Sequence, residues 1–230
     1  MTHPAPDRTP WPEAGRAHSR LIVVRHGQTA HNAGRRLQGH SDTPLDEVGL
    51  TQARQLAAHL HTRGVRAPRL HSSDLRRAAQ TAGALQSVLG GAVTLHEALR
   101  EIRMGDWEGQ RLDDIQAADP DRHARFWGGD PACAAPGGET PHEVTDRVHG
   151  MLAGLAPAPG ETLVLVSHGI AITGLLCRLL GLDYARAFAA GTTLHGNTAY
   201  SVLTLDGLRV VGASLARTDH LSPVPVGAGA

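Results

Sequence analysis

Two histidines each stand one residue after a largely apolar run and directly before a glycine. Arg25-His26-Gly27 follows residues 21–24, and Ser167-His168-Gly169 follows residues 162–166. Such runs are typical of buried strands, and the glycine would end each strand with a tight turn. Ligands of α/β sheets bind at the carboxyl ends of the parallel strands. The two motifs therefore predict two imidazoles that face one crevice.

The residues around these histidines suit the binding of phosphate. Arg25 precedes the first histidine, and Arg77 stands near the start of a later predicted helix. Two guanidinium groups fit a tetrahedral dianion, because their forks pair with phosphate oxygens. The helix expected after Gly169 adds backbone N–H groups and the positive end of its dipole. A neutral imidazole could attack phosphorus, so that one histidine would be phosphorylated and then hydrolysed.

A leaving alkoxide needs a proton, which a carboxylic acid at the rim of the site could supply. The loop of residues 99–109 offers Glu101 as the preferred donor and Asp106 and Glu108 as weaker alternatives. We expect neither a metal nor a cofactor, because the arginines would stabilise the equatorial oxygens that a metal otherwise holds.

The composition narrows the function classes. The chain of 230 residues has 22 basic and 22 acidic residues, and it contains no lysine, which excludes a P-loop lysine and a Schiff-base lysine. A formal net charge of zero gives no general affinity for nucleic acid or acidic membranes. Cys133 and Cys177 fit neither a metal spacing nor a disulfide framework, which favours the cytoplasm. No apolar stretch is long enough to span a bilayer.

The order of the predicted elements indicates an α/β fold in one large domain. We expect a disordered leader over residues 1–19, a single domain over 20–221 and a flexible tail over 222–230. After the first strand, a helix should run from the N-cap Asp46 to about Arg63, followed by a strand at 69–71, a helix at 78–89 and a strand at 93–95. The buried face predicted for the first of these helices comprises Leu50, Ala53, Leu56, Ala57 and Leu60.

At the start of the second half of the chain, the apolar residues follow a less regular spacing. Residues from about 106 to 140 form a partly helical excursion beyond the sheet. Thr140 and Glu143 make a capping box, with Pro141 at the first position of the helix that follows. After the second His-Gly strand we expect an apolar helix at 170–180 and a closing hairpin around Asp206-Gly207.

Further motifs extend the two histidine triplets. The first continues as RHGQT, followed by Asn32 and by Gln38-Gly39. Residues 73–81 read SDLRRAAQT, and Leu99 and Glu101 precede the sequence GDWEG. In this order and spacing the motifs resemble the histidine phosphatase superfamily, also called the phosphoglycerate mutase-like family, from about residue 21 to 221. The resemblance implies a three-layer sandwich in which helices flank a mostly parallel central sheet.

The resemblance also implies a role for each site residue. His26 would be the phosphorylated nucleophile, Glu101 the proton donor and His168 the second imidazole. Arg25 and Arg77 would act with them on the phosphate, whereas Arg76 would be a solvated helix residue. The expected substrate-binding residues are Arg25, Asn32, Gln38, Gly39, Arg77, Gly169 and Ile170.

We expect a phosphomonoesterase of the histidine acid phosphatase type that hydrolyses small phosphorylated metabolites without a metal. The cofactor-dependent mutases of the superfamily have a longer, lysine-containing insertion before the second histidine and a tyrosine where this chain has Met104. Both departures favour hydrolysis. A phosphoglycerate mutase is the alternative, and a non-catalytic phosphate-binding module is a weaker one. The GDWEG and PGGET segments and Gly196-Asn197 resemble the α-ribazole and glucosyl-3-phosphoglycerate phosphatases.

Several points stay open at this level. The partner should be a small phosphomonoester, and the oligomeric state is undetermined, with a homodimer as one alternative. Trp107 could pack its loop or contact substrate, and Asp106 and Glu108 could serve only to fix that loop. No role is assigned to His195.

Overall fold

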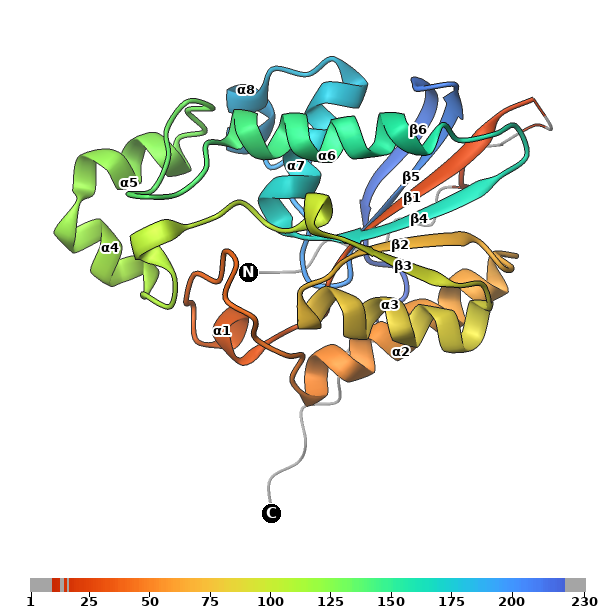
Figure 1. Cartoon of the computed structure of the whole chain (residues 1–230), viewed down its shortest axis with the longest axis horizontal. Coiled ribbons are helices and arrows are strands. Elements are labelled where there is room, and N and C mark those ends of the chain that lie inside the picture. Colours follow the sequence, from red (N-terminus) through yellow and green to blue (C-terminus); the bar gives the residue numbers. More distant parts are fainter. Residues whose placement is uncertain (1–9, 13–14, 16, 222–230) are drawn as a thin grey trace.

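The computed structural model describes residues 10–12, 15 and 17–221. Its centre is a six-stranded sheet in the order β3-β2-β4-β1-β5-β6 (Figure 1). The first four strands in this order are parallel, β5 runs antiparallel to β1, and β6 runs antiparallel to β5 at the edge of the sheet. The strands are β1 (Ser19–Arg25), β2 (Arg69–Ser73), β3 (Val93–His96), β4 (Thr162–Ser167), β5 (Tyr200–Asp206) and β6 (Arg209–Arg217).

Strands β1 and β4 are neighbours at the middle of the sheet, although most of the domain separates them in sequence. Their apolar runs, residues 21–24 and 163–166, are fully buried, as expected for parallel strands that are covered on both faces. The register pairs Arg25 with Ser167, so both strands end at the same level. The residues that follow them, His26 and His168, therefore emerge at the same place.

Successive residues of β1 point into different layers, because side chains alternate across a strand. Leu21 and Val23 pack with helices α6 (Pro141–Leu155) and α7 (Gly169–Leu180), whereas Ile22 and Val24 pack with α2 (Glu47–Thr62) and α3 (Arg76–Leu89). Figure 1 shows these two helix pairs on opposite faces of the sheet. The fold is thus the predicted sandwich of helices, mostly parallel sheet and helices.

The predicted start of α2 is confirmed, but the prediction that Leu50 belongs to its buried face is wrong. The Asp46 side chain accepts a hydrogen bond from Gly49 N and caps the helix. Leu50 is only half-buried, whereas Gly49 is buried. A Cβ atom on Gly49 would lie 2.1 Å from Gln28 O, so the helix turns this glycine toward the loop after β1. Backbone contact with that loop therefore adds Gly49 to the buried face, beside four of the five apolar residues that the spacing predicted.

The excursion contains short helices, as predicted, and α1, α4 and α5 lie beyond the carboxyl ends of the parallel strands (Figure 1). The capping box at Thr140 and Glu143 is present in α6, and the hairpin closes around Asp206-Gly207. The short helices are α1 (Ala30–Ala33), η1 (Glu97–Leu99), η2 (Gly105–Trp107), α4 (Leu112–Ala118), α5 (Pro120–Trp127) and α8 (Tyr184–Ala189).

The described part of the predicted leader folds against the domain. Ser19 already belongs to β1, and the Trp11 ring lies 6.0 Å from Tyr200 and 4.8 Å from the Arg63 guanidinium. Residues 1–9, 13, 14 and 16 of that leader and the tail of residues 222–230 lie outside the described residues. Within the described chain, no helix has the length and apolar character that crossing a membrane requires.

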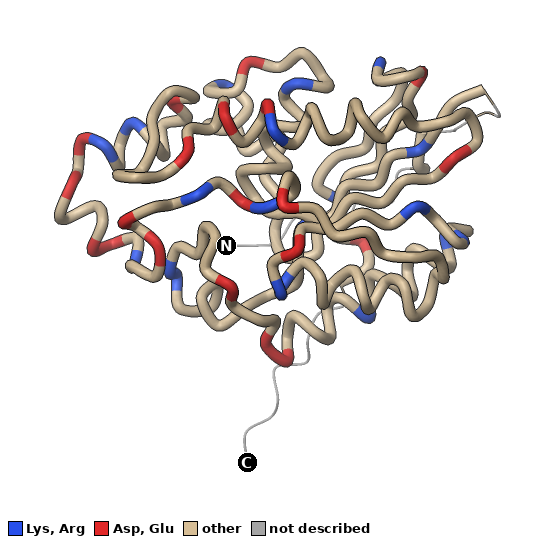
Figure 2. The backbone as a smooth tube through the Cα atoms, viewed as in Figure 1, with Lys and Arg blue, Asp and Glu red and all other residues tan. Residues whose placement is uncertain are grey.

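Charged residues of both signs are interspersed along the chain, and neither sign collects over one part of the fold (Figure 2). This distribution follows from the balance of acidic and basic residues in the sequence. Near the ends of β1 and β4, the guanidinium groups of Arg25 and Arg77 line one cavity.

Candidate active site

The two histidine rings lie side by side, as the convergence of the two strand ends predicts. Their ring centroids are 5.1 Å apart, and both side chains are buried. The backbone N–H of His26 donates to Ser167 O at 3.0 Å, which ties the turn after β1 to the last residue of β4. The positions of the imidazoles therefore depend on the sheet itself.

Hydrogen bonds assign opposite tautomers to the two rings. His26 Nδ1 lies 2.7 Å from the carbonyl oxygen of Gly27, which can only accept, so Nδ1 carries the proton and Nε2 has a free electron pair. Arg77 Nε donates to His168 Nδ1 at 3.1 Å, so His168 carries its proton on Nε2. This Nε2–H is buried and has no partner among the described residues. The site thus presents one nucleophilic nitrogen and one N–H donor.

Both imidazoles are held in the neutral form. Burial is the main cause that lowers the pKa of His26 well below its ordinary value of 6.5, and the nearby charges of Arg77 and Arg25 lower it further. Burial followed by Arg77 has the same effect on the pKa of His168. A neutral imidazole is the form that can attack phosphorus.

The Arg25 guanidinium is held by one hydrogen bond and has one nitrogen without a partner among the described residues. Its Nη1 donates to His195 O at 2.6 Å, whereas its Nε is buried without a partner among the described residues. The His195 ring turns away from the site, since its Nε2 lies 2.8 Å from Ser201 Oγ. His195 therefore contributes its backbone carbonyl, which is not a contribution that its side-chain type could indicate.

Arg77 is fully buried and makes three hydrogen bonds within the protein. Besides His168, it donates to Ser41 O at 2.7 Å and to Gly39 O at 2.8 Å. Burial lowers the pKa of Arg77 to about 10, which leaves the guanidinium charged at neutral pH. Three of its five N–H groups are used in this way, so two are left for a ligand.

Glu101 lies where α7 begins. Its carboxylate accepts from Ile170 N at 3.2 Å and from Ala171 N at 3.0 Å, which are unpaired N–H groups of the first helical turn. Arg147 of α6 holds the backbone of this loop by donating to Ala98 O and Glu101 O. No local pattern indicated Arg147, because its partners are backbone carbonyl groups of a distant loop and the carboxylate of Glu139.

The two alternative acids have other roles. Glu108 accepts from His40 N at 2.9 Å and from Ser41 Oγ at 2.8 Å, so it fixes the loop that carries Gly39. Asp106 is exposed and does not line the pocket. Trp107 is buried in the core with its ring 5.5 Å from Phe126, which resolves its two alternatives in favour of packing.

The turn after β1 is also held from the far side of the sheet. Asn32 completes a capping box with Thr29, and Gln38 accepts from the Thr29 hydroxyl at 3.0 Å. Asn197 Nδ2 donates to His26 O and to Asn32 Oδ1, each at 3.2 Å. The sequence motif Gly196-Asn197 thus lies next to the first histidine in space.

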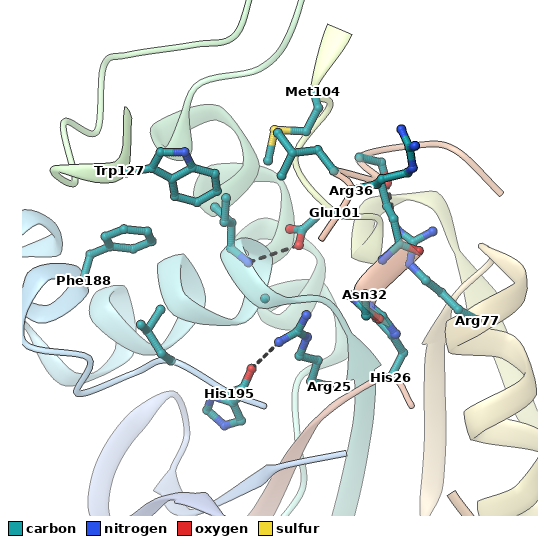
Figure 3. A pocket seen from close by; sticks show the side chains of 16 residues that line it. Arg25, His26, Asn32, Arg36, Arg77, Glu101, Met104, Trp127, Phe188 and His195 are labelled. Carbon is teal, nitrogen blue, oxygen red and sulfur yellow. Dashed lines mark hydrogen bonds between the residues drawn. The ribbon is translucent and has the colours of Figure 1, made fainter. Parts of the chain in front are cut away.

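These residues surround one cavity of about 410 Å³, shown in Figure 3. All the predicted substrate-binding residues line it, together with His26 and Glu101. His168 lies behind His26 and is not among the lining residues. The lining also contains seven residues that were not predicted to bind substrate, which are Arg36, Leu37, Met104, Trp127, Phe188, Leu194 and His195.

The inner end of the cavity can bind an anion. Two buried guanidinium groups, Arg25 and Arg77, face it with only one carboxylate, Glu101, and that carboxylate is already bound to the start of α7. Among the described residues, no group of three or more His, Cys, Asp or Glu side chains could hold a metal ion. The arrangement places a tetrahedral dianion next to the free electron pair of His26.

Known proteins resemble this chain in sequence and in structure. The sequence model of the histidine phosphatase superfamily (branch 1) matches residues 21–216. Over 163 residues the chain is 37% identical to the probable phosphoglycerate mutase GpmB of Salmonella paratyphi B, which corresponds to 70% of this chain and 75% of that protein.

Two solved structures share the architecture. The mycobacterial glucosyl-3-phosphoglycerate phosphatase complexed with VO3 superposes with a TM-score of 0.76 and 36% identity, over 86% of this chain and 98% of the other. The phosphoserine phosphatase of Entamoeba histolytica in complex with 3-phosphoglyceric acid gives a TM-score of 0.74 and 26% identity, over 89% of this chain and 100% of the other. The mostly parallel sheet flanked by helices is common to them.

Proposed function

This chain belongs to the histidine phosphatase superfamily, and we propose that within it the protein is a phosphomonoesterase that forms a phosphohistidine on His26. Membership makes it an enzyme of the phosphatase or mutase kind. The observation that supports the finer proposal is the pair of opposite tautomers, with the electron pair of His26 Nε2 and the unpartnered N–H of His168 at one anion site.

The first step transfers the phosphoryl group to the protein. The phosphate binds between Arg25 and Arg77, and His26 Nε2 attacks phosphorus as the bond to the leaving oxygen breaks. Glu101, in its protonated form, gives its proton to the leaving oxygen, so the alcohol departs neutral. The His168 N–H donates to an oxygen that gains charge.

The second step releases phosphate. Water attacks the phosphorus of the phosphohistidine, and the Glu101 carboxylate accepts a proton from that water. The P–N bond breaks, and His26 regains its electron pair. The step needs no metal, because the charge that develops on the phosphoryl oxygens faces guanidinium groups. Treatment with EDTA should therefore leave the activity unchanged, and restoration of a lost activity by zinc or magnesium would contradict this.

Mutase activity is the second candidate, and the identity with a probable phosphoglycerate mutase supports it. A mutase must hold the acid group of phosphoglycerate while the phosphoryl group returns to a different oxygen. Beyond Arg25 and Arg77, the cationic side chain among the lining residues is Arg36, which is exposed. This single cation at the rim favours hydrolysis.

The experiment measures phosphate release from a panel of phosphomonoesters, together with acid-quench labelling of the protein. Hydrolysis with label on His26 is expected, and 3-phosphoglycerate should yield phosphate and not its 2-phospho isomer. Label on His168 alone, or on a serine, would refute the nucleophile. Isomerisation without phosphate release would make the protein a mutase.

A further inference from the structure

The cavity has a second, apolar part beyond its anion site. Its wall comprises Trp127 at the end of α5, Phe188 of α8 and Leu194, and we call these three residues the apolar wall. Figure 3 shows Trp127 and Phe188 across the cavity from Asn32 and Arg77. Leu194 is 44% exposed, so it presents apolar surface to solvent beside the two aromatic rings.

The two aromatic residues of the wall are rigidly placed. The rings of Trp127 and Phe188 stack with centroids 6.3 Å apart and an angle of 22° between their planes. Tyr184 stacks on Phe188 from behind at 5.7 Å, and Phe126 contacts Trp127 edge-on at 5.0 Å. Each ring is therefore supported by a neighbour, so the wall can bind a flat group with little loss of side-chain freedom.

Contact between the excursion and α8 holds the wall together. A Cβ atom on Gly129, two residues after Trp127, would lie 3.1 Å from Ala185 Cα and 3.4 Å from Phe188 Cβ. The backbone after α5 thus approaches α8 as closely as a glycine allows. Neither helix alone forms the wall.

The charges of the cavity are confined to its other end. Arg25 and Arg77 face the phosphate position, and Arg36 lies at the rim, where its Nη1 donates to Gly109 O at 2.9 Å. No charged side chain belongs to the apolar wall. A second anionic group on the leaving alcohol would lose its hydration there without gaining an ion pair.

We propose that the apolar wall selects phosphomonoesters of alcohols that carry a flat apolar ring, and that it disfavours alcohols that carry a second negative charge. This inference rests on the proposed phosphatase function and adds the substrate class. The phosphate would occupy the arginine end, while the ring packs against Trp127 and Phe188. Contacts of this kind act on the ground state and the transition state alike, so they should lower KM more than they raise kcat.

The experiment compares three phosphates of primary alcohols, whose leaving oxygens make similar demands on Glu101. They are 2-phenylethyl phosphate, propyl phosphate and 3-phosphooxypropanoate, which carry a ring, a short chain and a carboxylate. We expect kcat/KM for the ring substrate to exceed that for propyl phosphate by about tenfold or more, as for other apolar pockets. The carboxylate substrate should be the poorest.

Variants of the wall test the origin of this preference. Trp127→Ala and Phe188→Ala should remove most of the preference through KM, while turnover of propyl phosphate persists and shows an intact fold. Trp127→Phe should restore part of it. Trp11→Ala is the matched control, because Trp11 is also half-buried but lies against Tyr200, away from the cavity. It should leave the preference unchanged.

The outcomes separate this inference from the proposed function. Equal kcat/KM for the ring and propyl substrates, or a preference that survives both alanine variants, would overturn the apolar wall as the selective element while phosphatase activity stands. The fastest turnover on 3-phosphooxypropanoate would overturn it in favour of recognition by Arg36. If none of the three is hydrolysed and no phosphohistidine forms, the proposed function fails and this inference fails with it.

Discussion

Two clusters of histidine and arginine can be compared, the active site and a second cluster near the C-terminus. They differ in whether the chain itself supplies the negative charge that pairs with the arginine. The second, which we call the C-terminal cluster, comprises His59, Tyr200, Arg217, Asp219 and His220. Here the chain supplies the anion itself, since Asp219 accepts from Tyr200 Oη at 2.8 Å and from Arg217 Nη2 at 2.8 Å. His59 Nε2 lies 2.8 Å from Tyr200 Oη and 3.6 Å from Asp219.

In the active site, no ion pair among the described residues joins Arg25 or Arg77 to a carboxylate, and Glu101 is instead bound to the start of α7. Arg25 Nε and His168 Nε2 are buried without partners among the described residues, and both belong to the anion site. The comparison teaches that similar residue types can serve stability or catalysis. Where the chain provides the counter-charge, the cluster binds segments together; where it does not, the cluster is ready for a ligand.

The largest effect should come from removing the nucleophile. His26→Ala should abolish turnover, in line with the loss of roughly 10⁶-fold when a covalent nucleophile is removed from another hydrolase. The unfolding midpoint should stay close to that of the wild type, because the His26 side chain donates only to the carbonyl of its own neighbour. Initial rates and thermal unfolding, measured on the same sample, check both parts. Residual turnover near the wild-type rate would move the nucleophile elsewhere.

The next largest effect concerns the proton donor. Glu101→Gln should slow alkyl phosphates by roughly 10²–10⁴, the range typical of general acid catalysis. Para-nitrophenyl phosphate should lose much less, since its leaving group departs without a proton. The measurement is the ratio of the two losses, which a merely loosened fold would leave near one.

Asp106→Asn is the control for this prediction, because Asp106 belongs to the same loop but is exposed and outside the cavity. It should cost little on either substrate. Equal losses on both substrates in Glu101→Gln would remove Glu101 from the donor role.

A substitution in the C-terminal cluster should lower stability and leave activity nearly unchanged, which is the opposite of the result expected for His26→Ala. Asp219→Ala should lower the free energy of unfolding by roughly 3 kcal/mol, at the low end for breaking a buried ion pair, because Asp219 keeps 10% exposure. The rate per folded molecule should change little. Chemical unfolding and initial rates check this prediction, with Asp206→Ala as the control, since the pair of Asp206 with Arg209 is exposed.

The stabilising effect of Asp219 should also depend on pH. Burial favours its neutral form, but hydrogen bonds from Arg217 and Tyr200 outweigh burial and lower the pKa of Asp219 below its ordinary value of 3.8. The carboxylate therefore contributes fully above that value, and the contribution is lost as the pH falls through the lower pKa of the folded protein. A variant as stable as the wild type at neutral pH would refute the role of Asp219.

The smallest effect on activity is expected from a change of pH near neutrality. Because the pKa of His26 lies well below 6.5 in the folded protein, its neutral form should persist below that pH. The pH profile of kcat/KM, corrected for ionisation of the ester, should place the acid limb of His26 below 6.5. Stability should also decrease as the pH is lowered. The unfolded chain protonates His26 at a higher pH than the folded protein does, so the free energy of unfolding falls as the pH falls from 6.5 toward the pKa of His26 in the folded protein. An acid limb of His26 above 6.5 would mean that the imidazole is not desolvated as the structure indicates.

Much of the active site could be predicted because its residues stand at fixed places in local patterns. His26 and His168 follow buried strands, and parallel strands end at one edge of a sheet. The capping residues Asp46 and Thr140 act within a few residues of themselves, so their helices begin where the sequence indicates. The residues to which the sequence assigned no role act across long separations, such as the His195 carbonyl on Arg25 and Arg147 on the loop of Glu101.

The sequence by itself determined the α/β fold, the two strand ends and the types of residue that meet there. Strand and helix periodicity is a property of neighbouring residues, and it needs no knowledge of the rest of the chain. Only the tertiary structure decided the tautomers of the two histidines, the role of His195 through its carbonyl, the face of α2 turned by Gly49 and the apolar wall. Each of these depends on an atom from a distant segment arriving within a few ångströms, and that distance is set by how whole elements pack together.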